Sequence, residues 1–217
     1  MPAVSETVVT DGRAGRAART RKAVVDALLA LIDAGNLRPT AREVADAAGV
    51  SLRSVYVHFD DVESLFLAAS ARHYERIQAL VTPWDPDAPL DERVDALVAR
   101  RTRIYKEGAQ VRRAALLQAP SSPALRNALE RGRRAGRAEL GAVFAAELRR
   151  VAEAERVRLL AALEVVAGAG THENLTTHPG LDGADEGVAG LMRDLVHATL
   201  TAWGVGRGPR PTTTGPA

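Results

Sequence analysis

Apolar residues recur at helical spacing along most of the chain, and no segment shows the apolar-polar alternation of a β-strand. The first such stripe predicts a helix from Arg16 to about Ala34, and Gly35 followed by Asn36 predicts its end. The apolar positions of this helix are Val25, Leu28, Leu29 and Ile32. The pattern of the whole chain predicts an all-α protein.

Two short helices are predicted next. Thr40 and Glu43 have the spacing of a capping box, which predicts the start of the first of them. Gly49 can adopt the left-handed backbone conformation that a sharp turn needs, and Ser51 predicts the N-cap of the second. Two short helices on a tight turn, the second rich in polar side chains, are typical of a helix-turn-helix that binds DNA.

The remaining apolar pattern predicts a larger helical part. The first expected helix begins at Asp60 or Asp61 and ends at Thr82-Pro83. Five more are expected from about Val94 to Gly108, from Val111 to Gln118, from Ser122-Pro123 to about Leu148, from 154 to 167 and from 185 to 203. Residues 168–184 are expected to form a loop, with a broken helical turn as the alternative within it. The predicted domains are a disordered basic arm (1–15), a helix-turn-helix domain (16–60), a helical ligand-binding and dimerisation domain (61–204) and a disordered tail (205–217).

Several classes of protein are disfavoured by what the sequence lacks. It has no cysteine, which excludes disulfides, thiolate catalysis and cysteine-based zinc sites. Charged residues interrupt every apolar run before the roughly 18 residues that a membrane span needs. The first residues do not resemble a secretory signal. We therefore expect a cytoplasmic protein without a membrane partner.

Motifs of enzymes are also missing from the sequence, which has no nucleophile-elbow, phosphate-loop or dinucleotide fingerprint. His172, Glu173 and His178 come nearest to a set of metal ligands, but they lack the i, i+4 spacing of a helical zinc motif. We predict no catalytic residue, no metal, no cofactor and no enzymatic activity.

Basic residues are concentrated just ahead of the predicted helix-turn-helix. The net charge of the chain is only +2, yet residues 13–22 contain five basic side chains and no acid. This segment, and within it Arg19, Arg21 and Lys22, is expected to attract a phosphate backbone, the alternative being a solvated arm. The arginines between Arg131 and Arg137 are interpreted as a solvated helix face, in preference to a second DNA site.

With these elements placed, the chain resembles the TetR family of bacterial transcriptional regulators. The stretch AAGVS followed by Y-x-H-F carries the resemblance, which covers about residues 16–67. It implies a homodimer formed by the last two long helices, here about 154–170 and 185–203, and a small-molecule effector of partly apolar character. Two recognition helices in such a dimer would bind a palindromic operator in double-stranded DNA.

The resemblance also implies roles for single residues. Leu52, Arg53 and Ser54 begin the recognition helix, where Arg53 would bind a guanine edge and Leu52 a thymine methyl group. The residues expected to donate to phosphates are Thr40, Ser51, Tyr56 and His58. For Tyr56 and His58, packing against the first helix of the motif is the alternative.

One position departs from the family pattern. The family usually has a lysine three residues after the H-F pair, where it contacts phosphate, but this chain has Val62 preceded by Asp60 and Asp61. The change predicts weaker phosphate binding, or a greater dependence on the basic segment 13–22.

Any effector site is expected in the larger helical part. Its unusual side chains are His73, Trp84, Tyr105 and His197, which we predict to line the pocket. Trp203, on an amphipathic helix, is interpreted as a core or dimer-interface residue.

Three functions are considered. The first is a homodimeric repressor that a small molecule releases from its operator. The second is a protein-interaction module that keeps the fold and has weakened or lost DNA binding, which Asp60, Asp61 and Val62 motivate. The third is an enzyme or carrier of small molecules, for which the sequence offers no positive feature.

Overall fold

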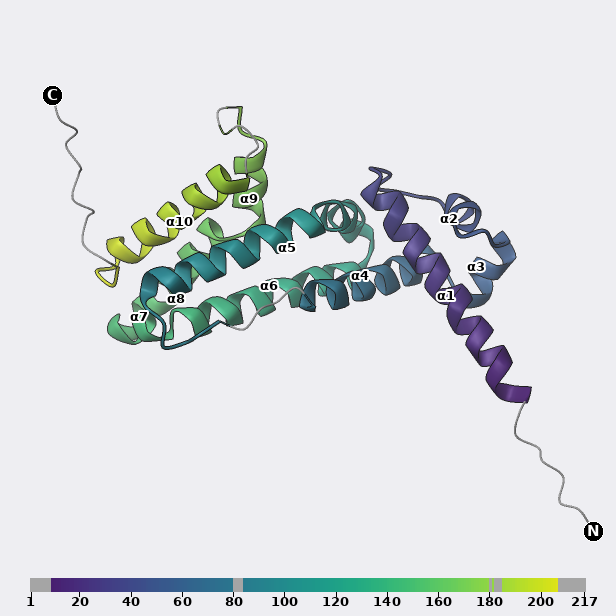
Figure 1. The fold of residues 1–217 in the computed structure, drawn as a ribbon, viewed down its shortest axis with the longest axis horizontal. Coiled ribbons are helices and arrows are strands. Elements are labelled where there is room, and N and C mark those ends of the chain that lie inside the picture. The colour runs from purple at the N-terminus through teal and green to yellow at the C-terminus, as the bar shows by residue number, and fades with distance from the viewer. Residues whose placement is uncertain (1–8, 80–83, 180, 182–184, 207–217) are drawn as a thin grey trace, which may run out of the picture. The chain divides into compact units, whose positions relative to one another are not determined.

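The described residues of the chain form helices joined by short loops and contain no strand, which confirms the predicted all-α class. The structure, a computed structural model, describes residues 9–79, 84–179, 181 and 185–206 (Figure 1). Its helices are α1 (Val9–Asp33), α2 (Ala41–Ala48), α3 (Leu52–His58), α4 (Val62–Gln78), α5 (Leu90–Gln118), the 3₁₀ turn η1 (Ala119–Ser121), α6 (Pro123–Val143), α7 (Ala145–Arg150), α8 (Glu153–Val166), α9 (Ala169–Thr176) and α10 (Asp185–Ala202).

The chain forms two compact units. The first comprises Met1–Ala79 and Gly108–Glu130, and the second comprises Leu80–Glu107 and Arg131–Ala217. The helices α5 and α6 therefore each contribute residues to both units. The unit that contains the helix-turn-helix includes α4, which the sequence analysis assigned to the larger part.

The first unit is built on α1, which contacts α2, α3 and α4. Figure 1 shows α1 crossing the pair formed by α2 and α3. The fully buried Leu28, Leu29 and Ile32 of α1 lie in one cluster with Val44, Val55, Phe59, Leu65 and Phe66. Because each of the short helices α2 and α3 buries only a few apolar side chains, their positions depend on this shared core.

The second unit has its own core. Its largest buried side chains are Leu97, Leu140, Phe144, Leu159, Leu163, Met192 and Leu200. Within it α10 packs on α8 and α9. Trp203 is partly buried against this core, and its indole Nε1 donates to Glu155 at 3.2 Å.

A buried ion pair joins α5 to α7 inside the second unit. Arg93 donates to both carboxylate oxygens of Glu147, at 3.0 and 2.7 Å, and also to the carbonyl of Val143. Both side chains are buried. Burial acts to raise the pKa of the Glu147 carboxyl. The hydrogen bonds and charge of Arg93, together with the backbone N–H of Glu147 and the charge of Arg150, outweigh it and hold that pKa below its ordinary value.

The two ends of the described chain differ from the expected disordered arm and tail. The helix α1 begins at Val9, earlier than the expected Arg16, although residues 9–15 include two glycines; each residue added to a helix that packing has already nucleated gains a backbone hydrogen bond. Val205 is buried, and its N–H donates to the carbonyl of Leu200. Residues 1–8 and 207–217 lie outside the described residues.

Three internal expectations are also corrected. The helix expected to stop near Gly108 and the short one expected over Val111–Gln118 are one helix, α5. The long helix expected from Pro123 to Leu148 is interrupted at Phe144 and divides into α6 and α7. The loop expected over 168–184 contains α9, while its residues 180 and 182–184 are outside the described part of the chain.

Candidate DNA-binding surface

The start of α2 is fixed by a capping box. The Thr40 hydroxyl accepts from the N–H of Glu43 at 3.3 Å, and the Glu43 carboxylate accepts from the N–H of Thr40 at 2.7 Å. The Thr40 hydroxyl also donates a hydrogen bond to that carboxylate, at 2.7 Å. Hydrogen bonds from the backbone and hydroxyl of Thr40 hold the pKa of Glu43 below its ordinary value. The predicted box is confirmed, and Thr40 is therefore a helix cap in addition to its expected phosphate role.

The turn and the start of α3 also follow the predicted pattern. Gly49 has φ +66°, a left-handed conformation that costs glycine little. Ser51 caps α3, since its hydroxyl accepts from the N–H of Ser54 at 3.1 Å and lies 2.9 Å from the hydroxyl of Ser54. These bonds orient a helix of only one to two turns.

One face of α3 is open to solvent. Val55 is buried in the core, whereas Arg53, Tyr56 and Val57 are exposed on the opposite side, at positions i, i+3 and i+4. Leu52 is partly buried and packs against the core. Val57, at 70% exposure, is a candidate contact that sequence reasoning missed. Its signal was an apolar residue at a position one helical turn after Arg53.

The three basic candidates on α1 have different surroundings. Arg21 donates from Nη1 to the carbonyl of His58 at 3.0 Å, and its Cζ lies 4.4 Å from the centroid of the Phe59 ring. Lys22 pairs with Asp26 one turn later, at 2.6 Å. Arg19 is exposed. All three residues lie on α1, within the helix that the sequence predicts from Arg16.

The acidic residues before α4 have a local structural role. Asp61 is the N-cap: its Oδ1 accepts from the N–H of Ser64 at 2.7 Å, and the Ser64 hydroxyl accepts from the N–H of Asp61 at 3.3 Å. Val62 is the first residue of α4 and packs partly against the core. Asp60 is exposed.

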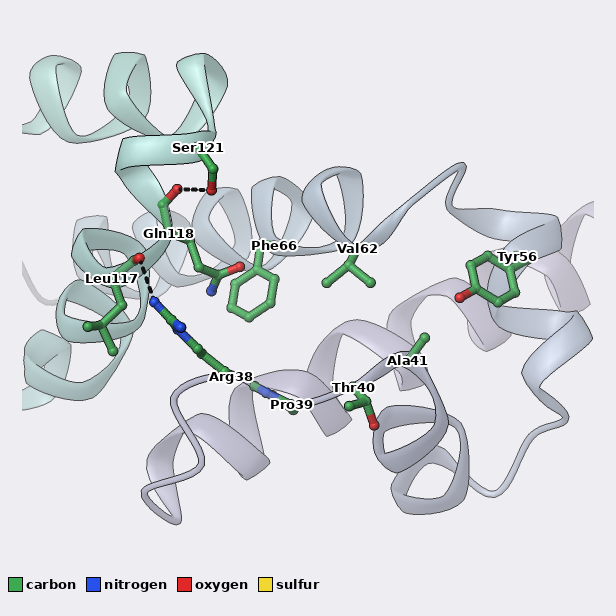
Figure 2. A pocket seen from close by; sticks show the side chains of 10 residues that line it. All are labelled: Arg38, Pro39, Thr40, Ala41, Tyr56, Val62, Phe66, Leu117, Gln118 and Ser121. Atoms are coloured by element: carbon green, nitrogen blue, oxygen red, sulfur yellow. Dashed lines mark hydrogen bonds between the residues drawn. The ribbon is translucent and has the colours of Figure 1, made fainter.

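An open groove of about 530 Å³ lies beside these helices in the first unit. It is lined by Arg38, Pro39, Thr40, Ala41, Tyr56, Val62, Phe66, Leu117, Gln118 and Ser121 (Figure 2). Figure 2 shows Val62 and Phe66 pointing into it from α4, and Arg38 reaching across it to donate to the carbonyl of Leu117 at 3.1 Å. Arg38 is a cation near Thr40 that sequence reasoning missed.

The four predicted ligand-binding residues are not assembled within one unit. His73 belongs to the first unit, where it faces Gly108 of α5, and the other three belong to the second. There Tyr105 donates to the carbonyl of Ala167 at 2.9 Å and lies 5.6 Å from His172 between ring centroids. Trp84 packs against the core, and His197 Nε2 lies 3.9 Å from Asp91. The groove of Figure 2 includes none of the four.

Among the described residues, no group of three or more histidine, aspartate or glutamate side chains is arranged to bind a metal ion. No helix in that part of the chain combines the length and apolar character of a membrane span.

The fold and surface define a class: a helix-turn-helix unit followed by a larger helical unit. Residues 24–69 match the family model of the bacterial regulatory proteins of the tetR family. This match spans the helix-turn-helix, so the segment 24–69 is similar to the DNA-binding part of that family. No curated protein matches the chain.

Three solved structures share this fold. A transcriptional regulator from Rhodococcus sp. Rha1 is 21% identical with a TM-score of 0.65, over 86% of this chain and 96% of its own. A tetR-family regulator from Streptomyces coelicolor is 23% identical with a TM-score of 0.65, over 85% and 81%. The multidrug binding protein EbrR, in complex with imidazole, is 22% identical with a TM-score of 0.55, over 90% and 93%.

Proposed function

We propose that the protein is a ligand-responsive transcriptional repressor that binds a palindromic operator as a homodimer. The observation that carries the proposal is the solvent-exposed face of α3, with Arg53, Tyr56 and Val57, on a helix whose start is capped and whose inner side is buried. A short helix whose outer face presents basic, hydroxyl and apolar side chains suits the major groove of DNA.

Individual side chains divide between two kinds of contact. Arg53 can donate hydrogen bonds from both of its terminal nitrogens to guanine O6 and N7, and Val57 or Leu52 can contact a thymine methyl group. Tyr56, His58, Ser51 and Ser54, with the N-terminal end of α2 at Thr40, are suited to phosphate oxygens or base edges. Arg19 and Lys22 on α1 add positive charge.

The homodimer is supported by an unpartnered apolar face on α8. Val157 and Val165 are 74% and 69% exposed, and Ala161 between them is exposed too, so the three lie on one side of the helix at i, i+4 and i+8. Ala198 and Ala202 are exposed on α10, which packs on α8. A self-complementary patch of this kind is what a two-fold interface requires.

A small-molecule effector is the third part of the proposal. One structural neighbour is a multidrug binding protein in complex with imidazole. In this chain, the larger helical part over residues 61–204 remains the expected place, and His73, Trp84, Tyr105 and His197 remain the predicted ligand residues. An effector would release DNA only by the difference in its affinity for the two conformations of the dimer.

The proposal is tested on a duplex carrying the promoter next to the protein's own gene. Arg53 and Tyr56 are replaced together by alanine, and affinity is compared with wild type and with Arg131→Ala, an exposed arginine of α6. Loss in the double variant alone, by about 2–4 kcal/mol for two lost contacts, supports the proposal. Equal affinities of all three proteins contradict it.

A second function, a protein-interaction module, is favoured by one observation: the start of α4 presents Asp60, Asp61 and Val62 where the family usually has a lysine. Under this alternative, binding to the promoter duplex would be weak in wild type and unchanged in the double variant.

A further inference from the structure

The recognition helix α3 has a weak point at its C-terminal end. It has only seven residues, and the last carbonyls of any helix lack partners inside that helix. Ser51 caps its N-terminal end. At the other end the backbone leaves the helix in extended conformation at Phe59, with φ −141°, without the left-handed glycine that often satisfies terminal carbonyls.

Arg21 of α1 supplies a hydrogen-bond donor for a terminal carbonyl of α3. Its Nη1 donates to the carbonyl of His58, the last residue of α3, at 3.0 Å. Its guanidinium lies over the ring of Phe59, with 4.4 Å from Cζ to the ring centroid. The ring itself is held in the core, being only 3% exposed. A planar guanidinium can stack on a ring and donate in its own plane at the same time, whereas an ammonium group cannot stack.

We propose that Arg21 is a positioning residue that fixes the C-terminal end of α3 against α1. By holding His58 and Phe59, it sets the orientation in which Arg53 and Tyr56 are presented to solvent. A phosphate contact alone, the role suggested by its place in the basic segment, would require neither the bond to His58 nor the stacking on Phe59. The functional consequence rests on the proposed DNA binding, but the structural claim does not.

Hydrogen exchange of the backbone amides in the full-length protein tests the structural claim. The variants are Arg21→Ala and Arg21→Lys, with Arg19→Ala as the matched control from an exposed position on the same helix. Alanine favours helix, so α1 is expected to stay folded. In Arg21→Ala the amides of Val55 to Phe59 should exchange about five- to tenfold faster, as expected for loss of one hydrogen bond and one cation–π contact. Unchanged exchange there, or the same increase in Arg19→Ala, overturns the proposal.

The salt dependence of DNA affinity tests the functional consequence, with the duplex carrying the promoter next to the gene. A positioning role predicts that Arg21→Ala lowers affinity about tenfold at every salt concentration without changing the slope of log K against log salt. It also predicts that Arg21→Lys does not restore the affinity. A pure phosphate contact predicts a slope smaller by about 0.9 and rescue by lysine, which would overturn the proposal. If wild type binds no DNA, the proposed function fails, while hydrogen exchange still decides the role of Arg21.

Discussion

At the scale of single residues, the start of α4 shows how one helix cap changes the charge near the candidate DNA-binding surface. Asp61 accepts from the N–H of Ser64, so its carboxylate is held by the positive end of the helix. Part of its negative charge is thereby offset. Val62, which follows it, is in the same groove as Thr40 and Tyr56 but brings no cation (Figure 2).

Replacing Val62 by lysine should therefore strengthen DNA binding. The added cation would be next to two expected phosphate contacts, and the lysine stem can cover the apolar surface that Val62 covers. We expect affinity to rise about five- to tenfold near 0.1 M salt and the salt slope to steepen by about 0.9. Fluorescence anisotropy at several salt concentrations measures both, with Val62→Met as the uncharged control. If the lysine and methionine variants bind alike, this groove does not face the DNA backbone.

Residues of the candidate site were predictable where local periodicity determines their exposure. Arg53 and Tyr56 are opposite the apolar Val55 on a short helix, and the sequence shows this directly. The partners of Arg21 and Arg38 were not predictable, because they lie 37 and 79 residues away along the chain. Their contacts depend on how helices pack, which no local pattern encodes.

At the scale of elements, helix ends were likewise predictable where the capping side chain is close in sequence to the group that it caps. The N-terminal ends of α2, α3 and α6 follow from side chains within three residues, namely Thr40 with Glu43, Ser51 with Ser54, and Ser122 with Leu125. The continuity of α5 does not follow from nearby side chains, since Gly108 resembles a residue that ends a helix. It is instead a close contact, where an added Cβ would be 3.0 Å from His73 Nε2. Tertiary packing overrides the local preference of glycine there.

The buried pair that joins α5 to α7 predicts how stability depends on pH. The folded pKa of Glu147 is below its ordinary value of 4.5, so the carboxylate stabilises the fold above about that pH. This contribution is lost as the pH falls through the lower, folded value. Glu147→Gln leaves Arg93 buried without its charge partner and should cost about 3–5 kcal/mol at neutral pH.

Urea unfolding of both proteins between pH 7 and pH 3 measures this effect, with Glu153→Gln, an exposed position on α8, as the control. The difference between wild type and Glu147→Gln should narrow below about pH 4.5, because protonated wild type then resembles the variant. A difference that is constant over the whole range would contradict the assigned role of the pair.

At the scale of the whole molecule, α5 and α6 matter because each belongs in part to both compact units. Any change that an effector produces in the second unit can pass along these continuous helices to the first, which is the physical basis of the proposed ligand response. The exposed side of α8 is the other feature at this scale, since it provides the proposed dimer contact.

Placing charge on the exposed side of α8 should separate the subunits of the proposed dimer. Val157→Glu combined with Val165→Glu would bury like charges against their symmetry mates, so the molar mass in light scattering should fall from twice 23.0 kDa to 23.0 kDa. Leu116→Glu, at an exposed apolar position of α5, serves as the control. A double variant that keeps the mass of wild type would show that α8 is not the interface.

The central claim, that a dimer of this chain reads a specific DNA sequence through α3, is tested most directly by selection of bound fragments from genomic DNA. We expect an enriched palindrome whose half-site centres are separated by about 34–36 Å or a multiple of that distance. Binding to it should weaken steeply with salt and lose about 1–3 kcal/mol of discrimination in Arg53→Ala. Recovery of no common sequence, or binding that is indifferent to salt and to Arg53, would contradict the claim.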